Sequence, residues 1–158
     1  MSVTVVCPGS FDPVTYGHLD VLERAASGFD RLVVACLRND GKNPLFTLDE
    51  RIGLLQEVTA HLRNIEIAAF DGLLVDFCKA RDIRLVVKGL RAVSDFEYEL
   101  QMAQMNRNLG AVETLFLPTS PVYSFLSSSL VKEVARFGGD ISDFVPAVVA
   151  DRLRERLS

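Results

Sequence analysis

A loop near the N-terminus combines residue types that could bind a phosphate group and stabilise charge on it. Gly9 permits a tight turn, Ser10 offers a hydroxyl group, and Gly17 and His18 stand where a helical pattern begins. The start of a helix presents free backbone N–H groups and a partial positive charge, which both suit phosphate oxygens. We expect His18 to donate a hydrogen bond to charge that builds on a phosphoryl group during its transfer. Taken alone, such a histidine could also simply cap the helix or lie half-buried.

Two further segments and one isolated lysine offer additional phosphate ligands. Lys88 and Arg91 flank Gly89-Leu90 after an apolar run, where one cation would be ordinary surface charge but two would be odd core material. Ser127–Ser129 precede another helical pattern, so they form either an N-cap or, with the free N–H groups, a phosphate cradle. Lys42 lies in a polar loop and would be unremarkable by itself.

The elements that position these residues follow from the spacing of apolar residues. Short, β-branched and mostly apolar runs predict buried parallel strands at Val3–Cys7, Arg31–Leu37, Ile65–Phe70, Arg84–Val87 and Thr114–Leu117. Helical spacing predicts helices at His18–Ser27, Leu48–Leu62, Leu74–Arg81, Phe96–Leu109, Leu130–Phe137 and Pro146–Leu157. Thr47 and Glu50 make a capping box before the second of these helices.

Alternating strands and helices predict an α/β fold, a doubly wound parallel five-stranded sheet with helices on both faces. The pattern has no linker or repeat, so we expect a single domain over residues 1–158. Ligands bind beyond the carboxyl ends of the strands in such sheets. The loops with Ser10, His18, Lys42, Lys88 and Arg91 should therefore meet at one edge.

The helix predicted at 96–109 has apolar residues on two opposite sides. Phe96, Leu100 and Ala103 mark one side, and Tyr98, Met102, Met105 and Leu109 mark the other. A helix that covers one face of a sheet needs only one apolar stripe. The second stripe therefore indicates a contact between subunits, with extra burial within the chain as the alternative.

Composition excludes several classes of protein. With 158 residues, 49% hydrophobic and 24% charged, the chain is typical of a packed globular protein and not of a disordered one. A net charge of −4 argues against a broad electrostatic grip on nucleic acid. Cys7, Cys36 and Cys78 form no C-x-x-C pair, so we expect reduced core cysteines and no structural zinc site. Without a signal-like or membrane-spanning run, the expected location is the cytoplasm.

Four strings carry a resemblance to a known family. The string G-S-F-D-P-x-x-x-G-H resembles the T/H-x-G-H signature of the nucleotidylyltransferase superfamily, and the segment before the 130–137 helix resembles its I-S-S-[TS] motif. Together with F-T-L-D-E-R, K-G-L-R-A-V-S-D-F-E-Y-E and S-F-L-S-S-S-L-V-K-E-V-A, they resemble bacterial phosphopantetheine adenylyltransferases over roughly residues 4–150.

The resemblance implies transfer of AMP from ATP to 4′-phosphopantetheine, which gives dephospho-coenzyme A and pyrophosphate in coenzyme A synthesis. It implies that His18 stabilises the transition state. The implied ATP contacts are Ser10, Phe11, His18, Gly89, Leu90, Arg91, Glu99, Tyr123, Ser124, Phe125, Leu126, Ser127, Ser128 and Ser129. The implied acceptor contacts are Ser10, Lys42, Leu74 and Lys88.

The resemblance also implies a cytoplasmic homohexamer that needs Mg²⁺, with coenzyme A as a candidate feedback ligand. Since Mg²⁺ usually keeps waters and takes substrate phosphates, we name no protein ligand for it, and favour nucleotide contact for Glu99. Many members have Thr at position 10, Arg at 88 and Trp at 123, where this chain has Ser10, Lys88 and Tyr123. Lys88 keeps the charge but lacks the bidentate fork of arginine.

Other functions stay open on the sequence alone. A superfamily member could use another phosphorylated acceptor, such as nicotinate mononucleotide or a polyol phosphate, or CTP in place of ATP. A non-catalytic nucleotide-binding regulator is an alternative of another class, although it would not need a histidine and three cationic segments. The chain lacks G-x-G-x-x-G and G-x-x-x-x-G-K-[ST], which excludes the usual dinucleotide and P-loop sites.

Overall fold

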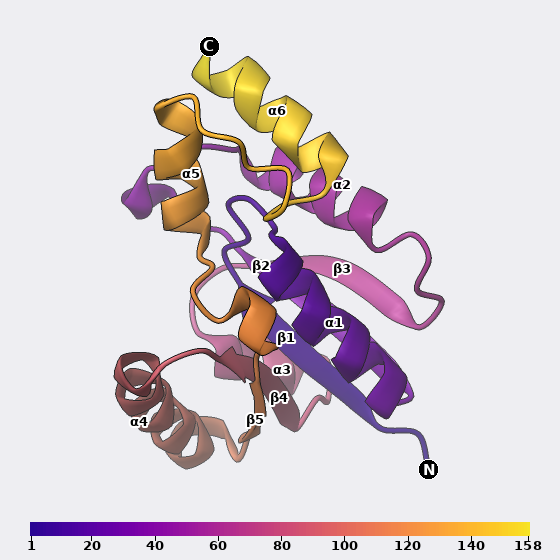
Figure 1. Ribbon diagram of the computed structural model, residues 1–158. Helices are drawn as coiled ribbons and strands as arrows, with labels where there is room; N and C mark the ends of the chain where they lie inside the picture. The colour runs from indigo at the N-terminus through magenta and orange to yellow at the C-terminus, as the bar shows by residue number, and fades with distance from the viewer.

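The computed structural model describes the backbone of residues 1–158 and every side chain except those of Asp40, Val93 and Ser94. Its five apolar, β-branched runs pair into one parallel sheet in the order β3-β2-β1-β4-β5. The strands are β1 (Thr4–Gly9), β2 (Arg31–Leu37), β3 (Ile65–Phe70), β4 (Leu85–Leu90) and β5 (Glu113–Pro118). The predicted doubly wound α/β fold is confirmed (Figure 1).

The sheet has a topological switch point between β1 and β4. From β1 the strands run outward to β3 on one side, and the chain then returns to place β4 and β5 on the other side. β1 pairs with β2 through six residue pairs. With β4 it pairs only at Val5–Leu85 and Val6–Val86. Beyond Val6 the two strands no longer pair towards their carboxyl ends, which is where doubly wound sheets bind ligands.

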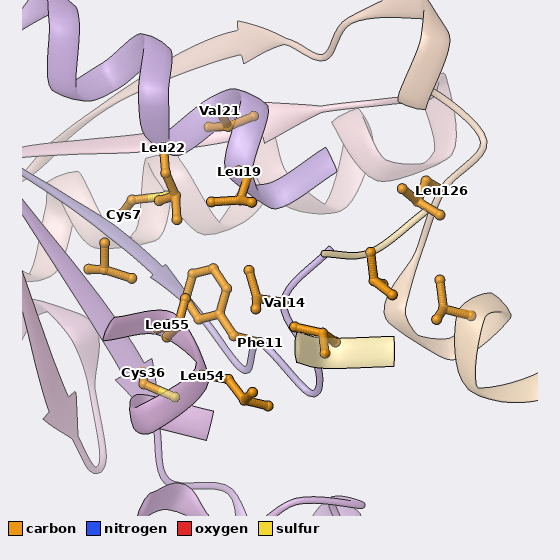
Figure 2. Packing of buried hydrophobic residues seen from close by; sticks show 14 of the residues in the cluster. Cys7, Phe11, Val14, Leu19, Val21, Leu22, Cys36, Leu54, Leu55 and Leu126 are labelled. Atoms are coloured by element: carbon orange, nitrogen blue, oxygen red, sulfur yellow. The ribbon is translucent and has the colours of Figure 1, made fainter. Parts of the chain in front are cut away.

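Helices cover both faces because successive strand residues point to opposite sides. The helices are α1 (Tyr16–Gly28), α2 (Leu48–Val58), α3 (Leu74–Ala80), α4 (Val93–Gly110), α5 (Ser128–Arg136) and α6 (Ala147–Leu157). Val5 and Val34 belong to the larger core, which includes residues of α1, α2, α5 and α6. Val6 and Val33 belong to the smaller core on the opposite face, with residues of α3. Figure 2 shows the larger core around the Phe11 ring. None of the helices is long and apolar enough to cross a membrane, among the residues that the structure describes.

Several element ends differ from the prediction. Helix α2 ends at Val58 rather than Leu62, and the chain turns after Thr59, whose hydroxyl donates to the Leu55 carbonyl at 2.6 Å. β1 and β4 extend to Gly9 and Leu90, so these glycine-bearing segments are strand ends rather than loops. Short 3-10 helices at Asp40–Lys42 and Pro121–Tyr123 occupy two segments for which we predicted no helix.

Helix α4 differs most from the expectation of one buried and one exposed apolar stripe. It lies beside the edge strand β5 and next to α3 (Figure 1). Phe96 and Leu100 of the first stripe are 40% and 37% exposed, and Met105 and Leu109 of the second are 54% and 55% exposed. Both stripes therefore remain largely uncovered within the chain. Asn106 is the buried residue among the described side chains of this helix.

Candidate active site

His18 is held by the residue that caps its own helix. Helix α1 begins at Tyr16, two residues earlier than predicted, with Thr15 as N-cap. The Thr15 hydroxyl accepts the His18 backbone N–H at 3.3 Å, and the Thr15 backbone N–H donates to His18 Nδ1 at 3.0 Å. Because Nδ1 accepts a hydrogen bond, the proton of the neutral ring is on Nε2.

The surroundings of His18 keep its ring neutral. Burial, and secondarily the positive charge of Arg91, lower the pKa of His18 to about 4. At neutral pH the ring is therefore an imidazole whose Nε2–H remains free to donate. Phe11 fixes the ring from the side, with its centroid 5.1 Å from that of His18 in an edge-to-face arrangement. A side chain at Gly9 would meet the Phe11 ring at 3.0 Å, so the absence of a Cβ gives Phe11 its place.

A first pocket opens in front of His18, at the carboxyl ends of β1 and β4. Its volume is about 270 Å³. The residues of the predicted ATP set that line it are Phe11, His18, Gly89, Arg91, Glu99, Leu126, Ser127 and Ser128. Two helix N-termini, those of α1 and α5, border it, and their free N–H groups favour anionic ligands.

The cations of the first pocket already have partners. Lys88 Nζ lies 3.2 Å from a carboxylate oxygen of Glu99. Arg91 Nε lies 3.2 Å from Asp95, and another of its N–H groups donates to the Leu126 carbonyl at 2.7 Å. These contacts hold both cationic heads at the pocket wall, where their remaining N–H groups can meet a phosphate.

The serine segment combines capping with pocket lining. Ser127 is the N-cap of α5, and its hydroxyl accepts the Leu130 N–H at 3.1 Å. Ser128 donates its hydroxyl proton to the Pro13 carbonyl at 2.7 Å, which ties α5 to the loop after β1. The N-cap alternative is thus confirmed for Ser127, while the phosphate cradle stays a prediction for a segment whose Ser127 and Ser128 line the pocket.

A second pocket of about 380 Å³ adjoins the first. All four residues of the predicted acceptor set line it, namely Ser10, Lys42, Leu74 and Lys88. Helix α4 contributes Tyr98, Met102, Ala103 and Asn106 to the same pocket. Tyr98 and Met102 come from the apolar stripe that we interpreted as a subunit contact, so part of that stripe faces a ligand pocket instead.

The two pockets share one wall. Pro8, Gly9, Lys88 and Glu99 line both of them. Two ligands, one in each pocket, would therefore meet at the ends of β1 and β4, with Lys88 between them. Such an arrangement suits a transfer between two phosphorylated molecules that are bound end to end.

Some residues of the predicted ATP set lie outside the first pocket. These are Ser10, Leu90, Tyr123, Ser124, Phe125 and Ser129. Ser10 lines the second pocket instead. Tyr123 stacks on Tyr16 at 6.1 Å between centroids, and the 57% exposed Phe125 packs edge-to-face with Phe144. The Ser124 hydroxyl donates to the Pro121 carbonyl.

Comparison with known proteins identifies the family. The chain is 61% identical to a phosphopantetheine adenylyltransferase of Streptomyces coelicolor over 152 residues, which cover 96% of each chain. The chain belongs to the phosphopantetheine adenylyltransferase family. Its residues 6–134 also match the cytidylyltransferase-like family model.

Two solved structures share the fold of this adenylyltransferase-family chain at low identity. A Vibrio parahaemolyticus protein described as a nicotinate-nucleotide adenylyltransferase is similar with a TM-score of 0.65 and 14% identity, over 97% of this chain and 99% of its own. A lipopolysaccharide core biosynthesis protein of Thermoplasma volcanium is similar with a TM-score of 0.55 and 22% identity, over 76% and 98%. These likenesses concern the fold.

The structure adds adenylyltransferase pocket residues that sequence reasoning missed. Cys7, Thr15, Val21, Asp95 and Thr119 all line the first pocket. Burial raises the pKa of Cys7 to about 12, against the lowering effect of Lys88, so its thiol stays protonated and is no nucleophile. A signal for Thr15 was present, since Thr is a favoured N-cap and stands three residues before His18. Val21 and Thr119 carry no polar pattern that could have marked them.

Proposed function

We propose that the first pocket binds ATP, the second binds 4′-phosphopantetheine, and the chain joins AMP to the acceptor phosphate with release of pyrophosphate. The observation that carries this proposal is the shared wall, because Lys88 and Glu99 line both pockets. The family membership supports the same pair of substrates.

The reaction needs charge stabilisation more than proton transfer. The acceptor phosphate monoester is anionic at neutral pH and attacks the α-phosphorus without a general base. His18, neutral and with Nε2–H as its free donor, would donate to an oxygen of the α-phosphate as negative charge builds there. Lys88 would neutralise charge between the two phosphates, and Arg91 would stabilise the departing pyrophosphate.

The acceptor would lie against α4, with its phosphate towards β1. Ser10 and Lys42 would bind the phosphate, since a hydroxyl and an ammonium group both donate to its oxygens. Leu74 and Met102 would contact the less polar pantetheine arm. This orientation places the acceptor oxygen on the Lys88 side of the pocket, as an in-line approach requires.

The site suits Mg²⁺ that arrives with the nucleotide. The described residues contain no group of three His, Cys, Asp or Glu side chains able to hold a metal ion, and the pocket carboxylates Asp95 and Glu99 each face a cation. When bound, Mg²⁺ would neutralise charge on the triphosphate and keep most of its waters. The residues present fit that form of metal binding better than a dedicated protein cage.

Three further properties belong to the proposal. The exposed apolar residues of α4, with Met105 and Leu109 about half exposed, support assembly into a homo-oligomer, for which the family suggests a hexamer. Coenzyme A contains the adenylyl half and the phosphopantetheine half of the product dephospho-coenzyme A. It would therefore occupy both pockets and compete with the substrates. The three buried, unbridged cysteines suit the reducing cytoplasm.

The test is an assay of the purified protein with ATP, Mg²⁺ and 4′-phosphopantetheine. We expect pyrophosphate and dephospho-coenzyme A to appear in equal amounts. Parallel reactions contain nicotinate mononucleotide or glycerol 3-phosphate as acceptor, or CTP in place of ATP. Faster pyrophosphate release with any of these would overturn the substrate assignment, and nucleotide binding without pyrophosphate release in all of them would overturn the enzymatic one.

A further inference from the structure

The segment Leu45-Phe46 is held by charged side chains from three separate elements. Asp12 accepts both backbone N–H groups, from Leu45 at 2.8 Å and from Phe46 at 2.9 Å. Arg51 of α2 donates to the Phe46 carbonyl at 3.2 Å, and Arg156 of α6 donates to the Leu45 carbonyl at 3.0 Å. All four backbone polar groups of this dipeptide are therefore bound by side chains. The dipeptide follows Lys42 by three residues, so these contacts fix the loop that carries a lysine of the second pocket.

Asp12 also binds a residue on the opposite side of the site. Lys132 of α5 lies with Nζ 3.0 Å from Asp12 Oδ2. Lys132 is one turn beyond Ser128, whose hydroxyl donates to the carbonyl of Pro13, the next residue after Asp12. The loop 12–13 thus contacts helix α5 at two successive turns, close to the helix N-terminus that borders the first pocket.

The ion pair is well shielded from water. Asp12 is 7% exposed, and the Lys132 side chain is 19% exposed. The side chains of Arg107 and Glu113, in contrast, pair at 3.1 Å while 72% and 57% exposed, and such surface pairs contribute little. Neither Asp12 nor Lys132 is among the residues that line the two pockets. The pair therefore does not contact a ligand directly. It can influence the site only through the segments that it holds in place.

We propose that Asp12 and Lys132 are positioning residues for AMP transfer. Their ion pair fixes the N-terminus of α5, in the wall of the nucleotide pocket, relative to the loop 42–46 of the acceptor pocket. In-line transfer depends on the relative placement of two bound molecules, and a displacement of about 1 Å can lower a rate by roughly a hundredfold. One carboxylate that binds both sides is suited to set that placement. This inference rests on the proposed function.

The test compares Lys132→Met, Lys132→Arg and the matched control Arg107→Met with the wild-type chain. The assay measures kcat and both KM values from pyrophosphate release with ATP and 4′-phosphopantetheine, and circular dichroism gives Tm and the folded fraction. We expect Lys132→Met to lower kcat per folded chain by about 10- to 100-fold. Both KM values should stay within about threefold, since a displaced helix keeps its own ligand contacts. Lys132→Arg, which can still pair with Asp12, should recover most of kcat, and the control should match wild type.

The outcomes separate the inference from its basis. A wild-type chain that releases no pyrophosphate refutes the proposed function itself. With an active wild type, three results would overturn the positioning role: an unchanged kcat in Lys132→Met, a rise confined to the KM for ATP, or a loss that Lys132→Arg does not repair. If Lys132→Met does not fold, Asp12→Asn takes its place, because it keeps the shape and one acceptor oxygen while removing the charge. The same lowered kcat with steady KM values is then expected, and an unchanged kcat would overturn the proposal.

Discussion

Replacing His18 by alanine should remove the hydrogen-bond donor on which AMP transfer most depends. The ring is neutral, its Nδ1 is occupied by the Thr15 N–H at 3.0 Å, and its Nε2–H is the free donor. Loss of one preorganised donor to a developing oxyanion typically lowers kcat by about 10²–10³-fold, or roughly 2.7–4 kcal/mol. We expect that decrease in kcat, with little change in the KM for either substrate.

The same substitution should also cost stability, for a reason that the structure makes explicit. Thr15 is 1% exposed, and His18→Ala leaves its backbone N–H without the Nδ1 acceptor. An unsatisfied buried N–H costs about 1–3 kcal/mol of unfolding free energy. The Thr15 hydroxyl still caps the His18 backbone N–H, so a value near the lower end is expected. Activity should therefore be measured well below the Tm of the variant.

The chain provides a matched control for this experiment. His61 is the second of two histidines, and its side chain is 56% exposed and 3.0 Å from Glu23 on the surface. His61→Ala should leave kcat and both KM values unchanged. The assay is initial-rate pyrophosphate release at saturating ATP and acceptor. Wild-type turnover in His18→Ala, or an equal loss in His61→Ala, would refute the role assigned to the imidazole.

Further expected results concern His18, the acceptor pocket and two glycines. Nitrogen-15 NMR of the His18 ring at pH 7 should show a protonated Nε2 and a bare Nδ1, and an imidazolium signal would contradict this. Because the pKa of His18 falls from the ordinary 6.5 to about 4 on folding, the unfolded chain binds more protons between these values, so stability should fall as pH decreases from 6.5 towards 4. This pH-dependent decrease should be smaller in His18→Ala. Lys42→Ala should raise the KM for the acceptor by about tenfold and leave the KM for ATP unaltered. A rise only in the KM for ATP would show that Lys42 contacts the nucleotide instead of the acceptor. Gly89→Ala should lose about 1–3 kcal/mol of unfolding free energy, because its Cβ would meet the stiff Val21 side chain at 2.8 Å. Gly53→Ala, with nothing within 4 Å of its Cβ in helix α2, should instead gain about 0.5–1 kcal/mol of unfolding free energy. Urea titration of both glycine variants measures these changes.

The parts of the fold that local chemistry determines were predictable from the sequence. β2 and β3 have the predicted bounds, since a buried parallel strand shows as an apolar, β-branched run of its own length. The capping box of Thr47 and Glu50 also forms as predicted, because both partners lie within one turn. The convergence of Ser10, Lys42 and Lys88 on one pocket likewise agrees with the expectation that loops at the carboxyl ends of parallel strands meet.

Features that depend on distant partners were not predictable. The burial of α4 residues depends on which elements lie beside the helix, so periodicity alone could not show that both stripes stay exposed or that Tyr98 and Met102 face a pocket. Asp12 belongs to the string G-S-F-D-P-x-x-x-G-H, but the sequence alone assigned it no role. Its hydrogen-bond partners are 33, 34 and 120 positions away in the chain.

The sparse pairing of β1 with β4 has a consequence for how the molecule holds together. The sheet consists of a three-stranded and a two-stranded portion, joined by the two residue pairs at Val5 and Val6. A ligand that spans both pockets adds contacts across this seam that the backbone does not make. Because such a ligand binds only the folded chain, its binding stabilises the folded state by mass action. The cleft between β1 and β4 is thus also the place where the sheet has the fewest residue pairs. We expect the bound substrates to stabilise the sheet there.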